Sequence, residues 1–243
     1  MFALFSRFIS LKGFYQTTYK YLPFVVVAFL SLFAYGLFAG LFLAPADYQQ
    51  GEGFRIIYVH VPSAFAAMGI YLIMAYCAIL TLIWRIKIAA ICMSASAGIG
   101  ASFTFLALVT GSIWGKPMWG TWWIWDARLT SMLILFFLYL GFIALQSSIA
   151  DNNTKDRAGA LVALVGVINL PIIHYSVNWW STLHQGATLS KFATPSIALS
   201  MLYPLLAMIT AFFLFYVILL TLRMRNIILL REVYSDWVKG IAV

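Results

Sequence analysis

Two histidines, His60 and His184, flank a tryptophan-rich segment in the sequence, and together these residues could hold a flat ring with a metal at its centre. Neutral imidazole is a common metal ligand, and two imidazoles on opposite faces of a planar macrocycle would ligate iron axially. Tryptophan offers a wide apolar face and a single N–H donor, which suits a flat and mostly apolar ring system. The order of these residues permits such a sandwich.

The elements that position these residues must be membrane helices. Hydrophobic residues make up 64% of the chain, charged residues make up 9%, and the mean hydropathy is +0.96. Six spans of about 20 residues would nearly fill the 243 residues, so we expect one domain over residues 1–243. The sequence predicts an all-α integral membrane protein whose six transmembrane helices lie near residues 21–44, 57–83, 91–113, 129–149, 158–178 and 198–222.

The distribution of lysine and arginine predicts the orientation of these spans. If the N-terminus is inside, the cytoplasmic side carries eleven of the fifteen cations and the outer side keeps Arg55, Lys116, Arg128 and Lys191. Both termini are therefore expected in the cytoplasm, with residues 1–20 as an interfacial segment. The net charge of +8 is then explained by the lysines and arginines of the cytoplasmic side, so it gives no reason to expect nucleic-acid binding.

This topology gathers seven of the nine tryptophans at the outer, periplasmic face, mostly in a loop between the third and fourth helices. An ordinary aromatic belt would divide them between both interfaces, so the asymmetry favours a binding platform. The platform is predicted to contain Trp114, Trp119, Trp122, Trp123, Trp125, Trp179 and Trp180.

Other ligands and other metals are less well supported. His174 follows the helix-kinking Pro171 by three residues, and we interpret it as a packing residue that satisfies a freed backbone carbonyl. Zinc would normally require three or four close ligands, often at the spacing H-E-x-x-H, and the outer face has no such pattern. The chain has no C-x-x-C-H sequence, so it does not attach a c-type haem covalently.

The outer cations run against the orientation rule and therefore suggest a role. Haem carries two propionates, and arginine pairs with carboxylates through two parallel hydrogen bonds. Arg128 and Arg55 are candidates for this contact, and a solvated arginine at a helix end is the alternative. Asp126 is predicted to cap the fourth helix, and it can also orient Arg128 or an indole N–H in the site.

The segment WGTWWIWDARLTS resembles the tryptophan-rich WWD signature of membrane haem-handling proteins. The sequences YVHVP at 58–62 and SVNWWSTLHQ at 176–185 resemble the other two outer segments of the CcmC family, so the similarity covers essentially the whole chain. Haem-lyase relatives usually follow the WD pair with proline and an acidic residue, whereas Asp126 precedes Ala-Arg-Leu-Thr. This difference argues against a thioether-forming enzyme.

The resemblance implies a non-enzymatic protein of the bacterial inner membrane that binds haem b at the periplasmic face through His60 and His184, with the WWD segment 114–130 as its platform. It also implies delivery of haem to the chaperone CcmE during c-type cytochrome biogenesis, with CcmD and the ABC transporter subunits CcmA and CcmB as partners. The chain lacks a G-x-x-x-x-G-K-[ST] phosphate loop, so ATP hydrolysis must occur elsewhere. A b-type haem subunit that reduces quinone and a haem-free transport permease are the alternatives.

Overall fold

The computed structural model describes residues 10–180, 182–184 and 197–241, and in these ranges the regular structure is helical apart from one isolated bridge between Asp47 and Gly51. Six helical segments are long and apolar enough to cross a membrane, which confirms the predicted all-α class and the six spans. They are α2 (Leu11–Phe38) continued by the π-helical η1 (Ala39–Leu43); the 3₁₀-helix η2 (Glu52–Ile56) continued by α3 (Ile57–Trp84); α4 (Lys87–Trp119); α5 (Ala127–Ser148); α6 (Asn152–Gly166) with α7 (Asn169–Trp179); and α8 (Leu199–Arg231), after which α9 (Asp236–Lys239) follows.

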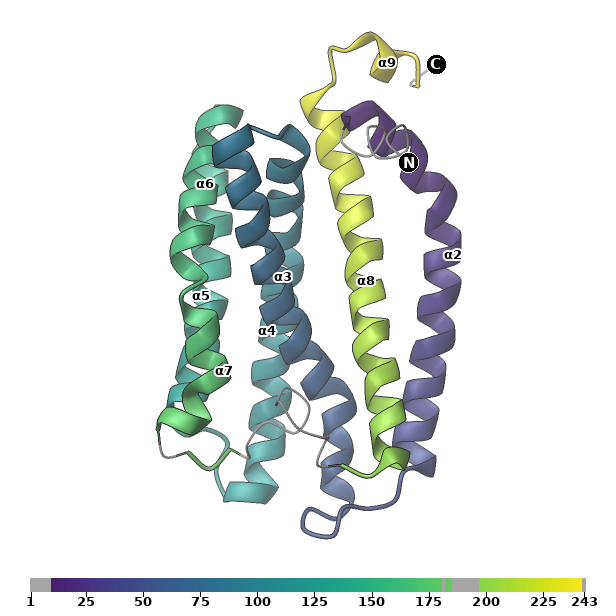
Figure 1. The fold of residues 1–243 in the computed structure, drawn as a ribbon, viewed down its shortest axis with the longest axis vertical. Helices are drawn as coiled ribbons and strands as arrows, with labels where there is room; N and C mark the ends of the chain where they lie inside the picture. Colours follow the sequence, from purple (N-terminus) through teal and green to yellow (C-terminus); the bar gives the residue numbers. More distant parts are fainter. Residues whose placement is uncertain (1–9, 181, 185–196, 242–243) are drawn as a thin grey trace.

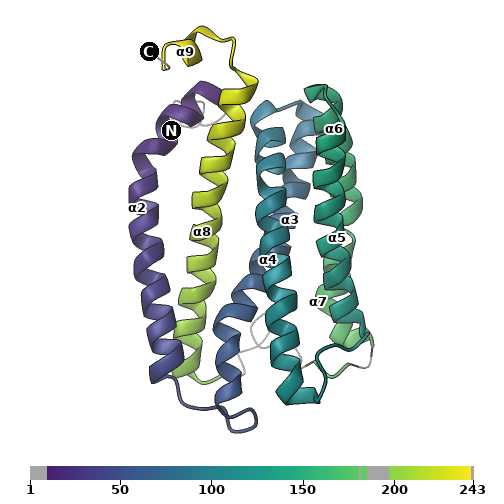
Figure 2. The same cartoon turned by 180° about the vertical axis from the view of Figure 1, so that it is seen from behind.

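The bundle has a central pair of helices with other helices on both sides. Figures 1 and 2 show α3 and α4 in the middle, α2 beside α8 on one side, and α5, α6 and α7 on the other. Helices α3 and α4 also contain the largest share of fully buried side chains, such as Tyr71 and Met74 on α3 and Ile91 and Met93 on α4. The core of the bundle therefore lies along these two helices.

The described ends of the chain lie at the same end of the bundle, together with the α3–α4 and α5–α6 connections (Figure 1). The α2–α3, α4–α5 and α7–α8 connections lie at the opposite end, which we call the tryptophan end because it carries Trp119 and Trp180. An even number of spans requires this arrangement. The membrane side that each end faces is a prediction from the lysine and arginine count.

Helix α4 is longer than the apolar run that predicted it. It continues past residue 113 to Trp119 and stops at Gly120, whose φ of 75° lies in the left-handed region that ends many helices. The Gly120 N–H donates to the Lys116 carbonyl at 3.1 Å. Because of this extension, Trp114 and Trp119 lie on a helix and only the other tryptophans of segment 114–130 lie in the connection.

The fifth span is broken in two, as Pro171 suggested. Proline has no N–H to donate to the carbonyl four residues earlier, which is that of Val167, and the helix is interrupted at Val167 and Ile168. The Val167 carbonyl instead accepts the Leu170 N–H at 3.0 Å. Helix α7 is therefore a separate helix, and its His174 lines a cavity at the tryptophan end.

Candidate functional site

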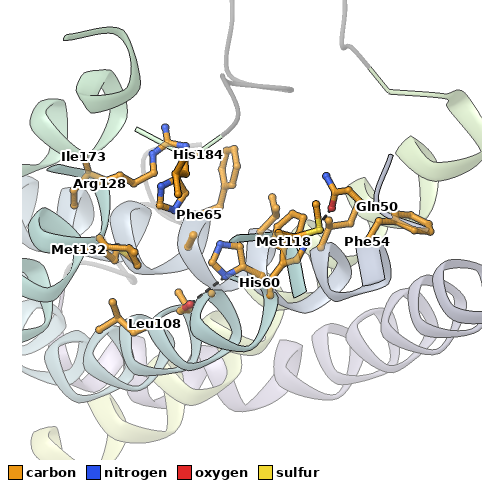
Figure 3. A pocket seen from close by; sticks show the side chains of 18 of the residues that line it. Gln50, Phe54, His60, Phe65, Leu108, Met118, Arg128, Met132, Ile173 and His184 are labelled. Carbon is orange, nitrogen blue, oxygen red and sulfur yellow. Dashed lines mark hydrogen bonds between the residues drawn. The ribbon is translucent and has the colours of Figure 1, made fainter. Parts of the chain in front are cut away.

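A cavity of about 360 Å³ lies at the tryptophan end between α3, α4, α5, α7 and α8 (Figure 3). His60 enters it from α3, Arg128 from α5, His174 from α7, and His184 from the connection that follows α7. The rest of the lining is mostly apolar and contains four methionines, namely Met68, Met118, Met132 and Met201. The structure therefore brings the two predicted ligands, 124 positions apart in the sequence, into one apolar cavity.

The His60 imidazole is held by helix α4. Its Nδ1 lies 3.1 Å from the Ala107 carbonyl oxygen and 3.1 Å from the Thr110 hydroxyl. A dashed line marks a hydrogen bond of His60 in Figure 3. A carbonyl oxygen only accepts, so Nδ1 carries the proton and Nε2 keeps its lone pair in the neutral ring. Gly111 lets the ring approach α4, since a Cβ there would lie 3.0 Å from the His60 Cε1.

The His184 imidazole is held by a carboxylate. Its Nδ1 lies 2.7 Å from Asp126 Oδ2 and 3.1 Å from the Thr182 hydroxyl, and the Thr182 hydroxyl itself donates to Asp126 Oδ2. The side chains of His184 and Asp126 are 17% and 7% exposed, so this pair is shielded from water. The carboxylate fixes the proton on Nδ1 and leaves Nε2 as the free ligand atom, which is the common arrangement behind metal-binding histidines.

Asp126 performs the predicted capping role and a second role that the sequence did not show. Its Oδ1 accepts the Leu129 N–H at 2.8 Å, which caps the start of α5. Its Oδ2 orients His184 rather than Arg128 or an indole. Burial raises the pKa of the Asp126 carboxyl, but the hydrogen bonds from Thr182 and Leu129 and the nearby His184 outweigh burial and leave the pKa below its usual value.

The pKa of His184 is also lowered, because burial disfavours the charged ring more than the Asp126 carboxylate favours it. The imidazole is therefore neutral at neutral pH. A neutral ring with a protonated Nδ1 has the Nε2 lone pair that metal coordination requires.

The predicted cations divide between the cavity and its surroundings. Arg128 lines the cavity, and its guanidinium donates to the His174 carbonyl at 3.4 Å. Arg55 lies outside the lining, because it pairs with Glu52 at 2.5 Å and donates to the Gly40 carbonyl at 2.8 Å. Lys116 donates to the Gly120 carbonyl at 3.1 Å, and Lys191 lies outside the described residues. Arg128 is therefore the cation that the cavity itself contains among the described residues.

Two of the seven outer tryptophans line the cavity. Trp114 meets the His60 ring edge to face at 5.6 Å between centroids, and Trp119 meets the His184 ring in the same way at 4.6 Å. Trp123 is half-buried, packs edge-on against Trp125, and has a buried indole N–H without a hydrogen-bond partner in the described chain. The remaining four are more than half exposed: Trp122, Trp125, Trp179 and Trp180.

The interpretation of His174 as a packing residue is wrong in one respect. Across the described ranges its imidazole makes no hydrogen bond to a freed carbonyl, and the carbonyl of Val167 accepts the Leu170 N–H. His174 lies on α7, after the break, and lines the cavity. The sequence indicates how deep His174 lies in its span but not the direction in which its side chain points.

Sequence reasoning missed three further residues of the site, and only one of them carried a signal. Thr182 lies two residues before His184, and small hydroxyl residues near a ligating histidine often orient it. Thr110 lies on a helix 50 residues from His60, and its spacing gives no sign of the contact. Gln50, in the α2–α3 connection, accepts the Trp114 indole N–H at 2.9 Å, and no motif marks it.

Comparison with known proteins supports one family for this chain. A family model described as "Heme exporter protein C" matches residues 4–239. A relative named "Heme exporter protein C" from Haemophilus influenzae is 51% identical over 228 residues, which cover 94% of this chain and 93% of the relative. The protein of the same name from Escherichia coli K12 is 51% identical over 92% of this chain and 90% of its own length.

A plant relative extends the similarity beyond bacteria. The Marchantia polymorpha protein named "Putative cytochrome c biosynthesis ccmC-like mitochondrial protein" is 47% identical over 82% of this chain and 84% of its own length. A family model that spans nearly the whole chain and relatives at this level of identity lead to one conclusion. The chain belongs to the CcmC family, heme exporter protein C.

Proposed function

We propose that this multi-pass membrane protein binds haem b non-covalently in the cavity at its tryptophan end, with His60 and His184 as the two axial ligands of the iron. One observation carries the proposal. Both imidazoles face the same cavity, and both have Nδ1 occupied by an acceptor, so that each Nε2 is left for a metal. Family membership supports a role in haem export and cytochrome c maturation.

The remaining lining fits the parts of a haem molecule. Methionine side chains are flexible and polarisable, and the four in the cavity suit the apolar face of a porphyrin that must later leave. The Arg128 guanidinium is the group that would pair with a propionate carboxylate. Trp114 and Trp119 each pack against one of the two ligand rings, so they limit the rotation of those rings.

The proposed direction of traffic follows from the family and the charge distribution. The lysine and arginine count supports a tryptophan end that faces the periplasm of a bacterial inner membrane. There the protein would pass its haem to the chaperone CcmE, in a complex with CcmD and the ABC subunits CcmA and CcmB. The exposed indoles of Trp122, Trp125, Trp179 and Trp180 are available there for the chaperone or for lipid headgroups.

The experiment that tests this function is a spectrum of the purified protein. A pyridine haemochrome assay detects bound haem b, and the ferric visible spectrum reports whether two strong axial ligands are present. We expect a low-spin, six-coordinate spectrum that is lost in His60→Ala and in His184→Ala. His174→Ala is the matched control, because His174 lines the same cavity and its imidazole has no hydrogen bond to another described residue, and its spectrum should be unchanged.

Each contrary outcome has a defined meaning. Purified wild-type protein without haem would favour the permease. Low-spin haem in both alanine variants would refute the ligand assignment. Rapid reduction of the bound haem by a quinol would favour the redox subunit.

A further inference from the structure

The α2–α3 connection is a preformed turn at the edge of the cavity. Residues Asp47 and Gly51 exchange backbone hydrogen bonds at 2.9 and 3.3 Å, and Asp47 Oδ1 accepts the N–H groups of Gln49 and Gln50 at 2.9 and 2.8 Å. Gly51 has a φ of 56°, which favours glycine. The connection therefore has a defined shape before any ligand binds.

The two ends of this connection are held together. Ala44 and Phe54 are each 3% exposed, so both stems are fixed in the core. Arg55 bridges them, because it donates to the Gly40 carbonyl at the end of the first span while it pairs with Glu52 beside it. Asp47, Gln50 and Phe54 line the cavity, so the connection forms part of its wall.

A chain of contacts runs from this wall to a proposed haem ligand. Gln50 Oε1 accepts the Trp114 indole N–H at 2.9 Å, and the Trp114 ring packs edge to face against the His60 imidazole. An indole has one donor, so this bond fixes which way the ring turns about its side-chain torsions. Gln50 thereby reaches His60 without touching it.

We propose that Gln50 is a positioning residue for haem, which acts through Trp114 to keep the His60 ring seated with Nε2 toward the cavity. This inference rests on the proposed haem-binding function. The proton on Nδ1 of His60 is set by Ala107 and Thr110 and does not depend on Gln50. Loss of the Gln50 contact should therefore speed the departure of haem and leave the spectrum of bound haem unchanged.

The test is haem release from the full-length protein to excess apomyoglobin, followed by the change in the Soret band. Gln50→Leu removes the acceptor, and Trp114→Phe removes the donor while it keeps an aromatic ring. A lost neutral hydrogen bond corresponds to release about three- to tenfold faster for each variant. The double variant should release haem no faster than the faster single variant, because both changes break one contact.

Two controls separate positioning from a general loss of stability. Gln50→Glu keeps an oxygen that accepts the indole N–H, so its release should stay near the wild-type rate. Gln49→Leu changes the neighbouring exposed glutamine and should also release haem at the wild-type rate. In the haem-free protein, ¹⁵N NMR of indole groups should show faster hydrogen exchange at Trp114 Nε1 in Gln50→Leu only.

The outcomes are distinguishable from a failure of the proposed function. Wild-type protein that binds no haem would refute the proposed function. If the wild type binds haem but Gln50→Leu releases it at the wild-type rate, the positioning role of Gln50 is refuted and the proposed haem binding stands. Additive increases in release rate in the double variant would have the same meaning.

Discussion

The two proposed ligands reach the same tautomer by different means. His60 stands on α3, inside the bundle, and its partners are a neutral carbonyl and a hydroxyl on the adjacent α4. His184 stands in a connection, and its partner is the carboxylate of Asp126. One ligand is therefore held by the packing of two long helices and the other by a charge and the fold of a connection. If the protein releases haem as we propose, the His184 side is the one that would open without disturbing the bundle.

Removal of a hydrogen-bond partner should lower haem affinity more at His184 than at His60. Asp126→Asn keeps a good helix cap but removes the charge behind His184, and we expect haem affinity to fall about 10- to 100-fold. Thr110→Val removes one of the two acceptors of His60 and should cost about threefold, because Ala107 remains. Haem titration of both variants gives the comparison, and equal losses would show that the charge has no special role.

A change at Arg128 tests whether this residue pairs with a haem propionate. Arg128→Gln should weaken haem binding about tenfold if the guanidinium pairs with a propionate. Haem dimethyl ester has no propionate charge, so the wild type and the variant should bind it equally. If the two proteins still differ tenfold in their affinity for the ester, Arg128 acts through its hydrogen bond to the His174 carbonyl and not through a propionate.

Acid should weaken the His184 side first. Burial keeps the pKa of the His184 imidazole below its usual 6.5, so the folded protein binds fewer protons there than the unfolded chain does as pH falls below that value. The folding stability that the neutral His184 ring contributes is complete above about pH 6.5 and declines below it, whereas the Nε2 lone pair of the folded protein is lost only around the lowered pKa of His184. Asp126 stays ionised through this window, because its own pKa is also lowered.

The charge of the Asp126 carboxylate also sets the pH at which haem affinity begins to decline. In Asp126→Asn the His184 pKa falls further, since the carboxylate that favours the charged ring is gone. The haem affinity of this variant should therefore be lower throughout but begin its decline at a more acidic pH. Haem affinity measured between pH 4 and 8 would contradict the assignment if both proteins had the same midpoint.

The exposed tryptophans should show the smallest effect on haem binding. Trp122→Phe and Trp125→Phe lie outside the cavity lining, and surface changes of this kind usually stay within about 0.5 kcal/mol. We expect haem affinity within about twofold of wild type by titration. A tenfold loss of haem affinity would indicate that these indoles belong to the haem platform that the sequence predicted.

The sequence predicted those features that depend on composition and on single strong signals. The six spans follow from long apolar runs, the break at Val167 follows from Pro171, and the cap at Asp126 follows from its place before α5. The directions of side chains in connections do not follow from any period. For that reason the sequence alone does not show that two of the seven tryptophans of the predicted platform line the cavity.

Contacts between distant segments were also beyond the sequence. Gln50 and Trp114 are 64 positions apart, and Thr110 and His60 are 50 apart, so only the packing of the helices brings each pair together. The place of His174 in the cavity lining was beyond the sequence as well, because Pro171 indicates a break between α6 and α7 but not which side chains of α7 face the interior.

The double use of Asp126 makes two events thermodynamically reciprocal. The carboxylate that begins α5 is also the carboxylate that orients His184. If iron coordination by His184 steadies the Asp126 carboxylate and so strengthens the cap of α5, a firmer first turn of α5 must in return favour coordination by the same free energy. Loading of the cavity would then be communicated to the start of a membrane helix, where the exchange rate of the Leu129 amide hydrogen would record it.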